Sequence, residues 1–348
     1  LAVGCANTSQ HLKAFEAVES GKAEFDTVMN ALTEDPDRLV SSHALAKEIH
    51  QIAQDIPDEE DALTALVIAA DISTHGFGMG EVHLRINAAQ IRNAMRPVDG
   101  RTISVSDGVS SPRLLIERLA LRIRKESAWD ISFASLDGET ATARRQLMLA
   151  TQFLKHIDSD QPVRLLIAEC EKPLTIMSAL YLAHKFGITG MIDISPLFET
   201  SYGLEHGEKI VDQLLQQPVF IDYLRQRGRL SIQTGFSDAG RFVGQVAANM
   251  AIERLQLKIL RSLKAKVGTS IDLLIFNTHG ESLGRGGAQA QIAQRQAWLM
   301  TPYVRQQAAE LGISLFHQSS FQGGDGYRLF GSEELAKATM RGLFVAEI

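Results

Sequence analysis

Short apolar runs alternate with longer amphipathic segments along most of the chain, and this pattern defines the elements that we expect. Apolar runs predict six strands, at residues 81–86, 163–168, 191–194, 230–236, 272–276 and 313–316. Apolar residues at helical spacing predict helices at residues 41–49, 58–70, 112–125, 139–157, 173–186, 205–226, 241–266, 287–311 and 332–343. Strands separated by helices form βαβ units with a parallel sheet. The sequence therefore predicts an α/β fold, a (β/α)₈ TIM-type barrel that is incomplete and has many additional helices.

The longest amphipathic segment, residues 241–266, would extend for about 39 Å as a single helix. Its apolar residues fall on one stripe at helical spacing, which consists of Phe242, Val246, Met250, Leu255, Ile259 and Leu263. We expect this whole stripe to pack against the core.

The length of the chain limits how many domains it can form. We expect residues 1–348 to form a single domain, because α/β barrels often reach this size without dividing. Residues 1–75 are expected to form a helical lead-in, and residues 76–348 the strands and helices of the barrel. The first residue is Leu1 rather than methionine, so we interpret the chain as a central fragment of a longer protein.

Composition and charge exclude two classes of partner. The formal net charge is −6, and no cluster of lysines and arginines with interleaved aromatic residues occurs, so we expect no nucleic acid partner. No apolar run reaches the roughly 18 residues of a membrane span, so we expect no membrane partner. The two cysteines, Cys5 and Cys170, do not make a disulfide framework, which favours a cytoplasmic location.

Two carboxylates are candidates for metal binding. Glu199 and Asp238 each follow an apolar strand by a few residues. If both strands belong to one parallel sheet, both side chains lie at its C-terminal edge. Oxygen ligands with open positions for water suit Mg²⁺ or Mn²⁺. The alternative is that both residues cap the helices that follow them.

Two arginines are candidates for binding an anion. Arg241 lies three residues after Asp238, where a helix is expected to begin, and a surface salt bridge is the alternative. Arg285 lies among Gly284, Gly286 and Gly287. Glycines allow positive φ and a close approach of the backbone to a ligand, and a guanidinium matches an oxyanion. The alternative for this segment is a mobile loop without a ligand.

Two further residues are open to two interpretations each. His279 is either a ligand or proton-transfer group, or a structural residue. Arg85 lies inside a predicted strand, where it either faces the barrel mouth or pairs with an acid, since an unpaired buried charge is costly.

Four segments contain motifs that occur together in one known family. Residues 196–200 read Pro-Leu-Phe-Glu-Thr, and residues 235–244 resemble the pattern G-Y-S-D-S-x-K-D-x-G. Residues 276–287 resemble F-H-G-R-G-G-x-x-G-R-G-G, and residues 82–87 are similar to a strand with the pattern L-D-L-R-Q-N. These are motifs of phosphoenolpyruvate carboxylase, and they occur here in the order of that family. The resemblance covers about residues 75–290.

The resemblance implies a (β/α)₈ barrel with extra helices that carboxylates phosphoenolpyruvate with bicarbonate to oxaloacetate and phosphate. This reaction is anaplerotic and supplies the tricarboxylic acid cycle. By resemblance, bicarbonate attacks the phosphoryl group to give carboxyphosphate and an enolate, and the enolate then captures carbon dioxide. The family uses Mg²⁺ or Mn²⁺ and commonly forms tetramers, which implies a homo-oligomer.

The matching motifs also imply roles for individual residues. Glu199 and Asp238 match the family's metal ligands, and Arg285 matches an arginine that serves the bicarbonate and phosphate step. Arg241 stands where the family has a lysine, and His279 stands where it has another catalytic arginine. The remaining matched positions imply substrate binding, and they are Arg85, Gly284, Gly286 and Gly287.

Several motif positions depart from the family pattern. Asn277 replaces a histidine, Glu281 replaces a glycine, Phe242 replaces an aspartate and Glu81 replaces an arginine. Two alternatives to a carboxylase therefore stay open. The first is a carboxylase-like protein without catalysis that binds a small anion, and the second is another barrel lyase that acts on a phosphorylated acid.

Overall fold

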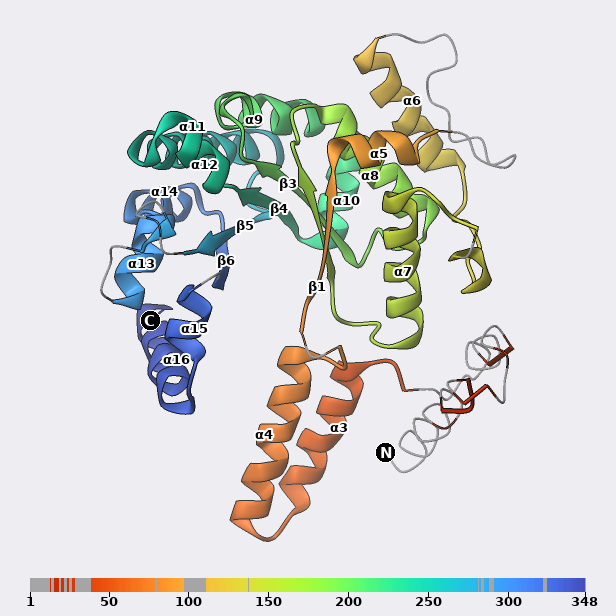
Figure 1. Ribbon diagram of the computed structural model, residues 1–348, viewed down its shortest axis with the longest axis vertical. Helices are drawn as coiled ribbons and strands as arrows, with labels where there is room; N and C mark the ends of the chain where they lie inside the picture. Colours follow the sequence, from red (N-terminus) through yellow and green to blue (C-terminus); the bar gives the residue numbers. More distant parts are fainter. Residues whose placement is uncertain are drawn as a thin grey trace. The chain divides into compact units, whose positions relative to one another are not determined.

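A computed structural model of the chain contains one six-stranded sheet whose strands are neighbours in the order of the sequence (Figure 1). The strands are β1 Val82–Asn87, β2 Val163–Ala168, β3 Ile192–Phe198, β4 Arg229–Thr234, β5 Asp272–His279 and β6 Leu315–Phe321. β3 to β6 pair in parallel, each with the next. Six strands of a sheet that needs eight to close confirm the α/β class and the incomplete barrel for the described part of the chain.

The structure describes residues 39–347 except 79, 97–110, 137, 281, 283–284, 288–290 and 322–323. Before residue 39 it describes only residues 13, 16–18, 20–21, 24 and 27–28, and the side chains of residues 134, 238, 325, 346 and 347 are not described.

Helices connect the strands and confirm the prediction of many additional helices. Their bounds are α3 Ser42–Asp55, α4 Glu59–His75, α5 Ala88–Ala94, α6 Pro112–Lys125, α7 Thr142–His156, α8 Pro173–Lys185, α9 Ser201–Leu214, α10 Pro218–Arg227, α11 Ser237–Val243, α12 Gln245–Val267, α13 Ile292–Leu299, α14 Pro302–Leu311, α15 Gly324–Phe330 and α16 Glu333–Glu347. Within the described ranges, none of them combines the length and the apolar character that crossing a bilayer requires.

The chain divides into two compact units. The first contains Leu1–Leu84, Glu126–Arg164 and Leu182–Ile192, and the second contains Arg85–Lys125, Leu165–Tyr181 and Asp193–Ile348. Every residue that the sequence singled out for chemistry belongs to the second unit. The single-domain organisation stays a prediction.

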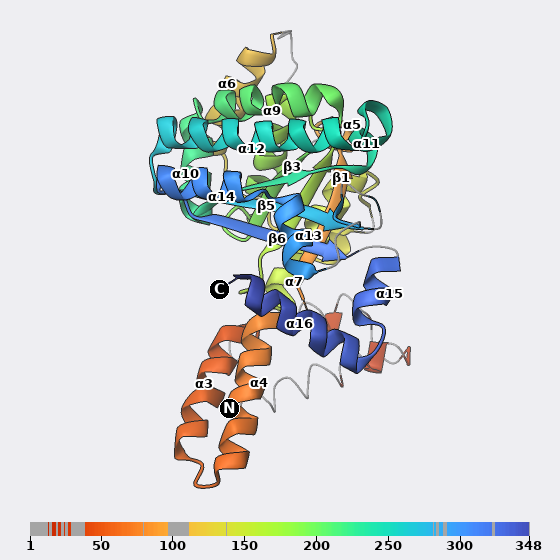
Figure 2. The same cartoon turned by 90° about the vertical axis from the view of Figure 1, so that its left-hand side faces the viewer.

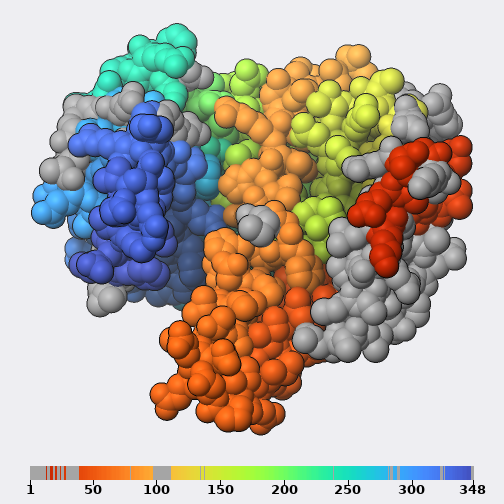
Figure 3. Space-filling view, turned by 60° about the horizontal axis from the view of Figure 1, so that its bottom comes forward, coloured from red at the N-terminus to blue at the C-terminus, as the bar shows by residue number. Residues whose placement is uncertain are grey.

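In the first unit, α3 and α4 pack side by side, and they form part of the orange surface in Figure 3. The buried carboxylate of Asp158 joins this helix pair to the segment after α7. It accepts hydrogen bonds from the backbone N–H of Phe77 (2.7 Å) and from the hydroxyl of Ser42 (3.2 Å). These bonds satisfy a carboxylate that would otherwise be buried at high cost.

In the second unit, α9 and α12 lie side by side and cover one face of the sheet (Figure 2). The ring of Phe198, the last residue of β3, lies between these two helices and the sheet. A Cβ atom added to Gly207 of α9 would lie 2.9 Å from this ring and 3.0 Å from Leu255 of α12. Glycine therefore lets α9 approach the sheet closely. Since Phe198 pairs with Thr234 in register, Thr234 faces the same helices.

The predicted helix at 241–266 is wrong in one respect, because the structure divides this segment into α11 and α12. The break falls at Gly244, whose φ of +89° is a conformation that residues with a Cβ rarely adopt. Only the second half of the predicted stripe packs in the core, and it consists of Leu255, Ile259 and Leu263. Phe242 is 81% exposed, and Val246 and Met250 are exposed as well. The expectation of core packing for these three residues is wrong, and the start of α12 is buried at Ala248, on another face of the helix.

Other boundaries differ from the prediction as well. β5 continues to His279, so the predicted turn at 277–279 is a strand. The helical segments predicted at 205–226 are the two helices α9 and α10. The single helix predicted at 287–311 is wrong, because the structure forms α13 and α14 there, and Pro302 at the start of α14 has no N–H with which to continue α13.

Cys170 is buried and forms no disulfide, and Cys5 lies outside the described residues. Burial raises the pKa of the Cys170 thiol to about 12. The thiol is therefore protonated at neutral pH and is a poor nucleophile.

Candidate functional site

Glu199 follows β3 directly and lies half-buried at the C-terminal edge of the sheet. Its Oε1 accepts a hydrogen bond from the backbone N–H of Glu169 (3.2 Å), which follows β2. Glu169 has a φ of +56°, and within the described part of the chain every other residue with a positive φ is a glycine. Such backbone conformations persist where surrounding contacts hold them, and they gather at functional sites. The loop after β2 therefore orients the carboxylate of Glu199.

The residue after Glu199 is held by the same loop. The hydroxyl of Thr200 donates a hydrogen bond to Oε1 of Glu171 (2.7 Å) and accepts one from the N–H of Gly203 (3.0 Å). Thr200 is thus the N-cap of α9. The cap interpretation therefore applies to Thr200 rather than to Glu199.

Gly235 brings the end of β4 against Glu199. Its N–H donates to the carbonyl of Phe198 (3.0 Å), and an added Cβ atom would lie 2.6 Å from Cβ of Glu199. Asp238 follows three residues later in α11, and its side chain lies outside the described residues. The structure thus brings the chain segments of the two predicted metal ligands to adjacent strand ends. Carboxylate oxygens are the donors that Mg²⁺ and Mn²⁺ prefer, so the residues fit such an ion. Among the side chains that are described, no three metal-binding residues form a cluster.

Arg285 lies over Gly280 in the loop that follows β5. A Cβ atom added to Gly280 would lie 2.6 Å from Cζ of Arg285, so no larger residue fits there without moving the guanidinium. The Nε of Arg285 donates to the hydroxyl of Ser282 (3.1 Å). The loop thereby fixes the stem of this arginine.

A second arginine supports the same loop from inside. Arg295 of α13 is buried, and its Nη2 donates to the carbonyl of Gly280 (3.2 Å). Gly286 has a φ of +78°, and its added Cβ would lie 3.2 Å from Cβ of Arg295. Gly287 donates its N–H to the carbonyl of Ser282 (3.0 Å), whereas Gly284 lies outside the described residues. Glycine at 286 is therefore required by its backbone conformation and by its packing.

The remaining predicted site residues lie in different surroundings. Arg241 is exposed in the last turn of α11, and Arg85 is exposed on β1. His279 is fully buried, and its ring stacks on Phe321 of β6 with the centroids 4.6 Å apart. Burial and stacking favour the structural interpretation of His279.

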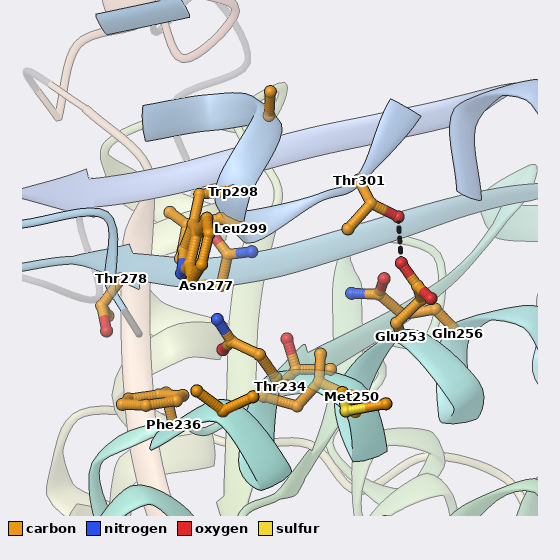
Figure 4. A pocket seen from close by; sticks show the side chains of 14 residues that line it. Thr234, Phe236, Met250, Glu253, Gln256, Asn277, Thr278, Trp298, Leu299 and Thr301 are labelled. Carbon is orange, nitrogen blue, oxygen red and sulfur yellow. Dashed lines mark hydrogen bonds between the residues drawn. The ribbon is translucent and has the colours of Figure 1, made fainter. Parts of the chain in front are cut away.

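Sequence reasoning missed Glu169 and Glu171, and it missed a pocket beside the ends of β4 and β5 (Figure 4). The two glutamates directly follow the apolar run of β2, so the rule that selected Glu199 would have found them. Glu253, Gln256, Trp298 and Thr301 line the pocket. No sequence signal marks these four residues, because they lie inside or beside ordinary amphipathic helices.

Comparisons with known proteins agree on one family. A family model described as phosphoenolpyruvate carboxylase matches residues 6–299. The phosphoenolpyruvate carboxylase of Marinomonas sp. is 31% identical over 127 residues, which are 36% of this chain and 14% of that protein. The phosphoenolpyruvate carboxylase of Corynebacterium glutamicum is 23% identical over 270 residues, 74% of this chain and 28% of that protein. In Chlamydomonas reinhardtii, phosphoenolpyruvate carboxylase 2 is 32% identical over 106 residues, 30% of this chain and 8% of that protein. The chain thus spans less than a third of the length of these relatives.

Proposed function

This chain belongs to the phosphoenolpyruvate carboxylase family, and from this premise we propose that it carries metal- and anion-binding residues for the carboxylation of phosphoenolpyruvate with bicarbonate. The products are oxaloacetate and phosphate, and the reaction replenishes the tricarboxylic acid cycle. The family also supports a homo-oligomer, a tetramer, in the cytoplasm.

The contact between Gly235 and Glu199 is the observation that carries this proposal. It joins the segment that contains Glu199 to the segment that contains Asp238, at the edge where parallel sheets hold their ligands. Glu199 and Asp238 would hold Mg²⁺ or Mn²⁺. A divalent cation supplies positive charge that stabilises the negative charge developing on the enolate oxygen.

In the reaction, a bicarbonate oxygen forms a bond to phosphorus, and the bond between phosphorus and the enol oxygen breaks. Carboxyphosphate then divides into carbon dioxide and phosphate, and the enolate carbon forms a bond to carbon dioxide. Arg285 binds the phosphoryl and bicarbonate oxygens, because a guanidinium forms paired hydrogen bonds to oxyanions. Arg241 and Arg85 add positive charge, and the glycines at 284, 286 and 287 let the loop backbone approach the anion.

One observation favours a second candidate function, a carboxylase-like protein that binds a small anion without catalysis. At the position of a family catalytic arginine the chain has His279, which is buried against Phe321. The loop therefore has one arginine fewer to stabilise the transition state. We assign His279 to the support of the loop in both candidates, and product formation separates them.

Gly235→Ala tests the proposed site through its geometry. The added methyl group must displace Glu199, whose Cβ would be 2.6 Å away. A displacement of about 1 Å can reduce a rate by roughly 100-fold, so we expect kcat/KM for oxaloacetate formation to fall by about that factor. Gly138→Ala is the matched control, because no atom lies within 4 Å of the added methyl group. Both variants are compared with the original protein in a coupled assay. Activity of Gly235→Ala within twofold of the control would show that Glu199 is not a ligand of the reacting centre.

A further inference from the structure

A pocket of about 200 Å³ lies between α12, the ends of β4 and β5, and α13 (Figure 4). Thr234 and Phe236 line it from β4 and the residues after it, and Asn277 and Thr278 line it from β5. None of the residues proposed above for the metal or the anion belongs to its lining. The pocket is thus separate in its residues from the proposed carboxylation site.

The lining is mainly apolar, and it includes Phe236, Met250, Ile252, Trp298 and Leu299. No lysine, arginine or histidine lines the pocket. Its one charged residue is Glu253, whose Oε2 accepts a hydrogen bond from the hydroxyl of Thr301 (2.5 Å). This charge disfavours a phosphate or a carboxylate, so the pocket does not suit phosphoenolpyruvate, bicarbonate or oxaloacetate.

Gln256 gives the pocket a polar group that its neighbours do not satisfy. The side chain is 1% exposed, and Nε2 has no hydrogen-bond partner among the described residues. Buried polar groups normally have a partner, because leaving one unpaired is costly. Gln256 lines the pocket, next to Glu253 and Thr301 (Figure 4). An acceptor atom on a bound molecule would complete the bonding of this amide.

We propose that this pocket binds an uncharged, ring-sized apolar molecule that carries one hydrogen-bond acceptor. The ring of this molecule would lie against Trp298 and Met250. Its acceptor atom would accept a hydrogen bond from Nε2 of Gln256. The size is suitable, since an apolar protein cavity of about 150 Å³ accommodates benzene. Pockets that are mostly apolar with a few oriented polar groups are the usual form of small-molecule sites. This site goes beyond the proposed carboxylation and does not depend on it.

Benzamide and benzoate are the probes that test the proposal. They share one ring and nearly one shape, but benzamide is neutral with a carbonyl acceptor and benzoate is anionic. We expect saturable binding of benzamide in a calorimetric or ligand-observed NMR titration of the protein. Benzoate should bind at least about tenfold more weakly, because it would be buried beside Glu253.

Two variants test whether benzamide binds in this pocket. Gln256→Leu removes the amide donor and should weaken benzamide binding by about tenfold, the effect of one buried hydrogen bond. Ala297→Leu narrows the pocket and should abolish binding. The matched control is Gln233→Leu, which replaces another buried glutamine that does not line the pocket, and it should leave the affinity unchanged.

Circular dichroism checks that each variant is folded, and if one variant fails to fold, the other decides. Absence of benzamide binding to the folded original protein would overturn the proposal. Equal affinity for benzoate, or unchanged binding in a folded Gln256→Leu or Ala297→Leu variant, would overturn it as well.

Discussion

Glu199→Gln is expected to lower the rate of oxaloacetate formation by about 1000-fold or more. An amide keeps the size of the side chain and can still accept the hydrogen bond from Glu169, so the loop should keep its structure. It removes the negative charge that binds a divalent cation. Because such a cation contributes several kcal/mol to transition-state stabilisation, its loss corresponds to a factor of about 1000. Initial rates at saturating substrate, with Mg²⁺ and then with Mn²⁺, measure the effect.

Glu171→Gln is the matched control for this variant. It makes the same chemical change in the neighbouring loop, where an amide oxygen can still accept the hydrogen bond from Thr200. We expect its rate to remain within threefold of the original protein. If Glu199→Gln kept more than a tenth of the activity, Glu199 would not be a metal ligand of the reaction.

Asp193→Asn is expected to lower the free energy of unfolding by about 3 kcal/mol, the cost of removing one partner from a buried ion pair. Asp193 is 1% exposed, at the N-terminal end of β3. Its Oδ1 accepts from Nε of Arg227 (2.9 Å), and its Oδ2 accepts from Nη2 of Arg229 (2.5 Å). The arginines are 10% and 27% exposed, so they keep part of their hydration when the charge is lost. The decrease in the free energy of unfolding should therefore lie at the lower end of the range that is typical when one partner of a buried ion pair is removed.

The same carboxylate makes stability depend on pH. Burial by itself would raise the pKa of Asp193, but the hydrogen bonds and positive charges of Arg227 and Arg229 outweigh burial and lower it. A carboxyl group whose folded pKa is lowered stabilises the fold above its unfolded pKa of about 3.9, and this contribution is lost as the pH falls through the folded value. Asp193→Asn should therefore differ most from the original protein at neutral pH and less in acid.

Urea denaturation at pH 7 and at pH 3 measures both effects. Asp222→Asn is the control, since Asp222 pairs with Arg225 on the surface, where ion pairs contribute little. Equal stability of the Asp193 and Asp222 variants at pH 7 would contradict the account of the buried pair.

The strands were predictable where most residues of a short run are apolar, even where one charged residue interrupts the run, as Arg164 does in β2. Residues 163–168 form β2 as predicted, because every residue from Val163 to Ile167 is buried, as in a strand covered on both faces. The helix at 241–266 was less predictable. Its apolar stripe shows which residues share a face, but only the tertiary structure decides which part of that face is covered. Leu255 is buried and Phe242 is exposed for this reason.

Only part of the candidate site could be predicted from the sequence, as was true of the fold. The rule that ligands lie at strand ends selected Glu199, which lies directly after β3 and beside Gly235, and its role as a ligand stays a prediction. The extension of β5 to His279 was not predictable, since the polar residues Asn277 and Thr278 precede it in the sequence. Gln256 was not predictable either, because a glutamine on a long helix is usually a surface residue. Its burial depends on packing between distant segments.

The most direct test of the central claim is the formation of oxaloacetate by the purified protein from phosphoenolpyruvate and bicarbonate with Mg²⁺, in the presence and in the absence of a chelator. The account predicts oxaloacetate and phosphate in equal amounts, and it predicts that the chelator abolishes both. Folded protein that forms no oxaloacetate under these conditions would contradict the proposed carboxylation and would favour anion binding without catalysis.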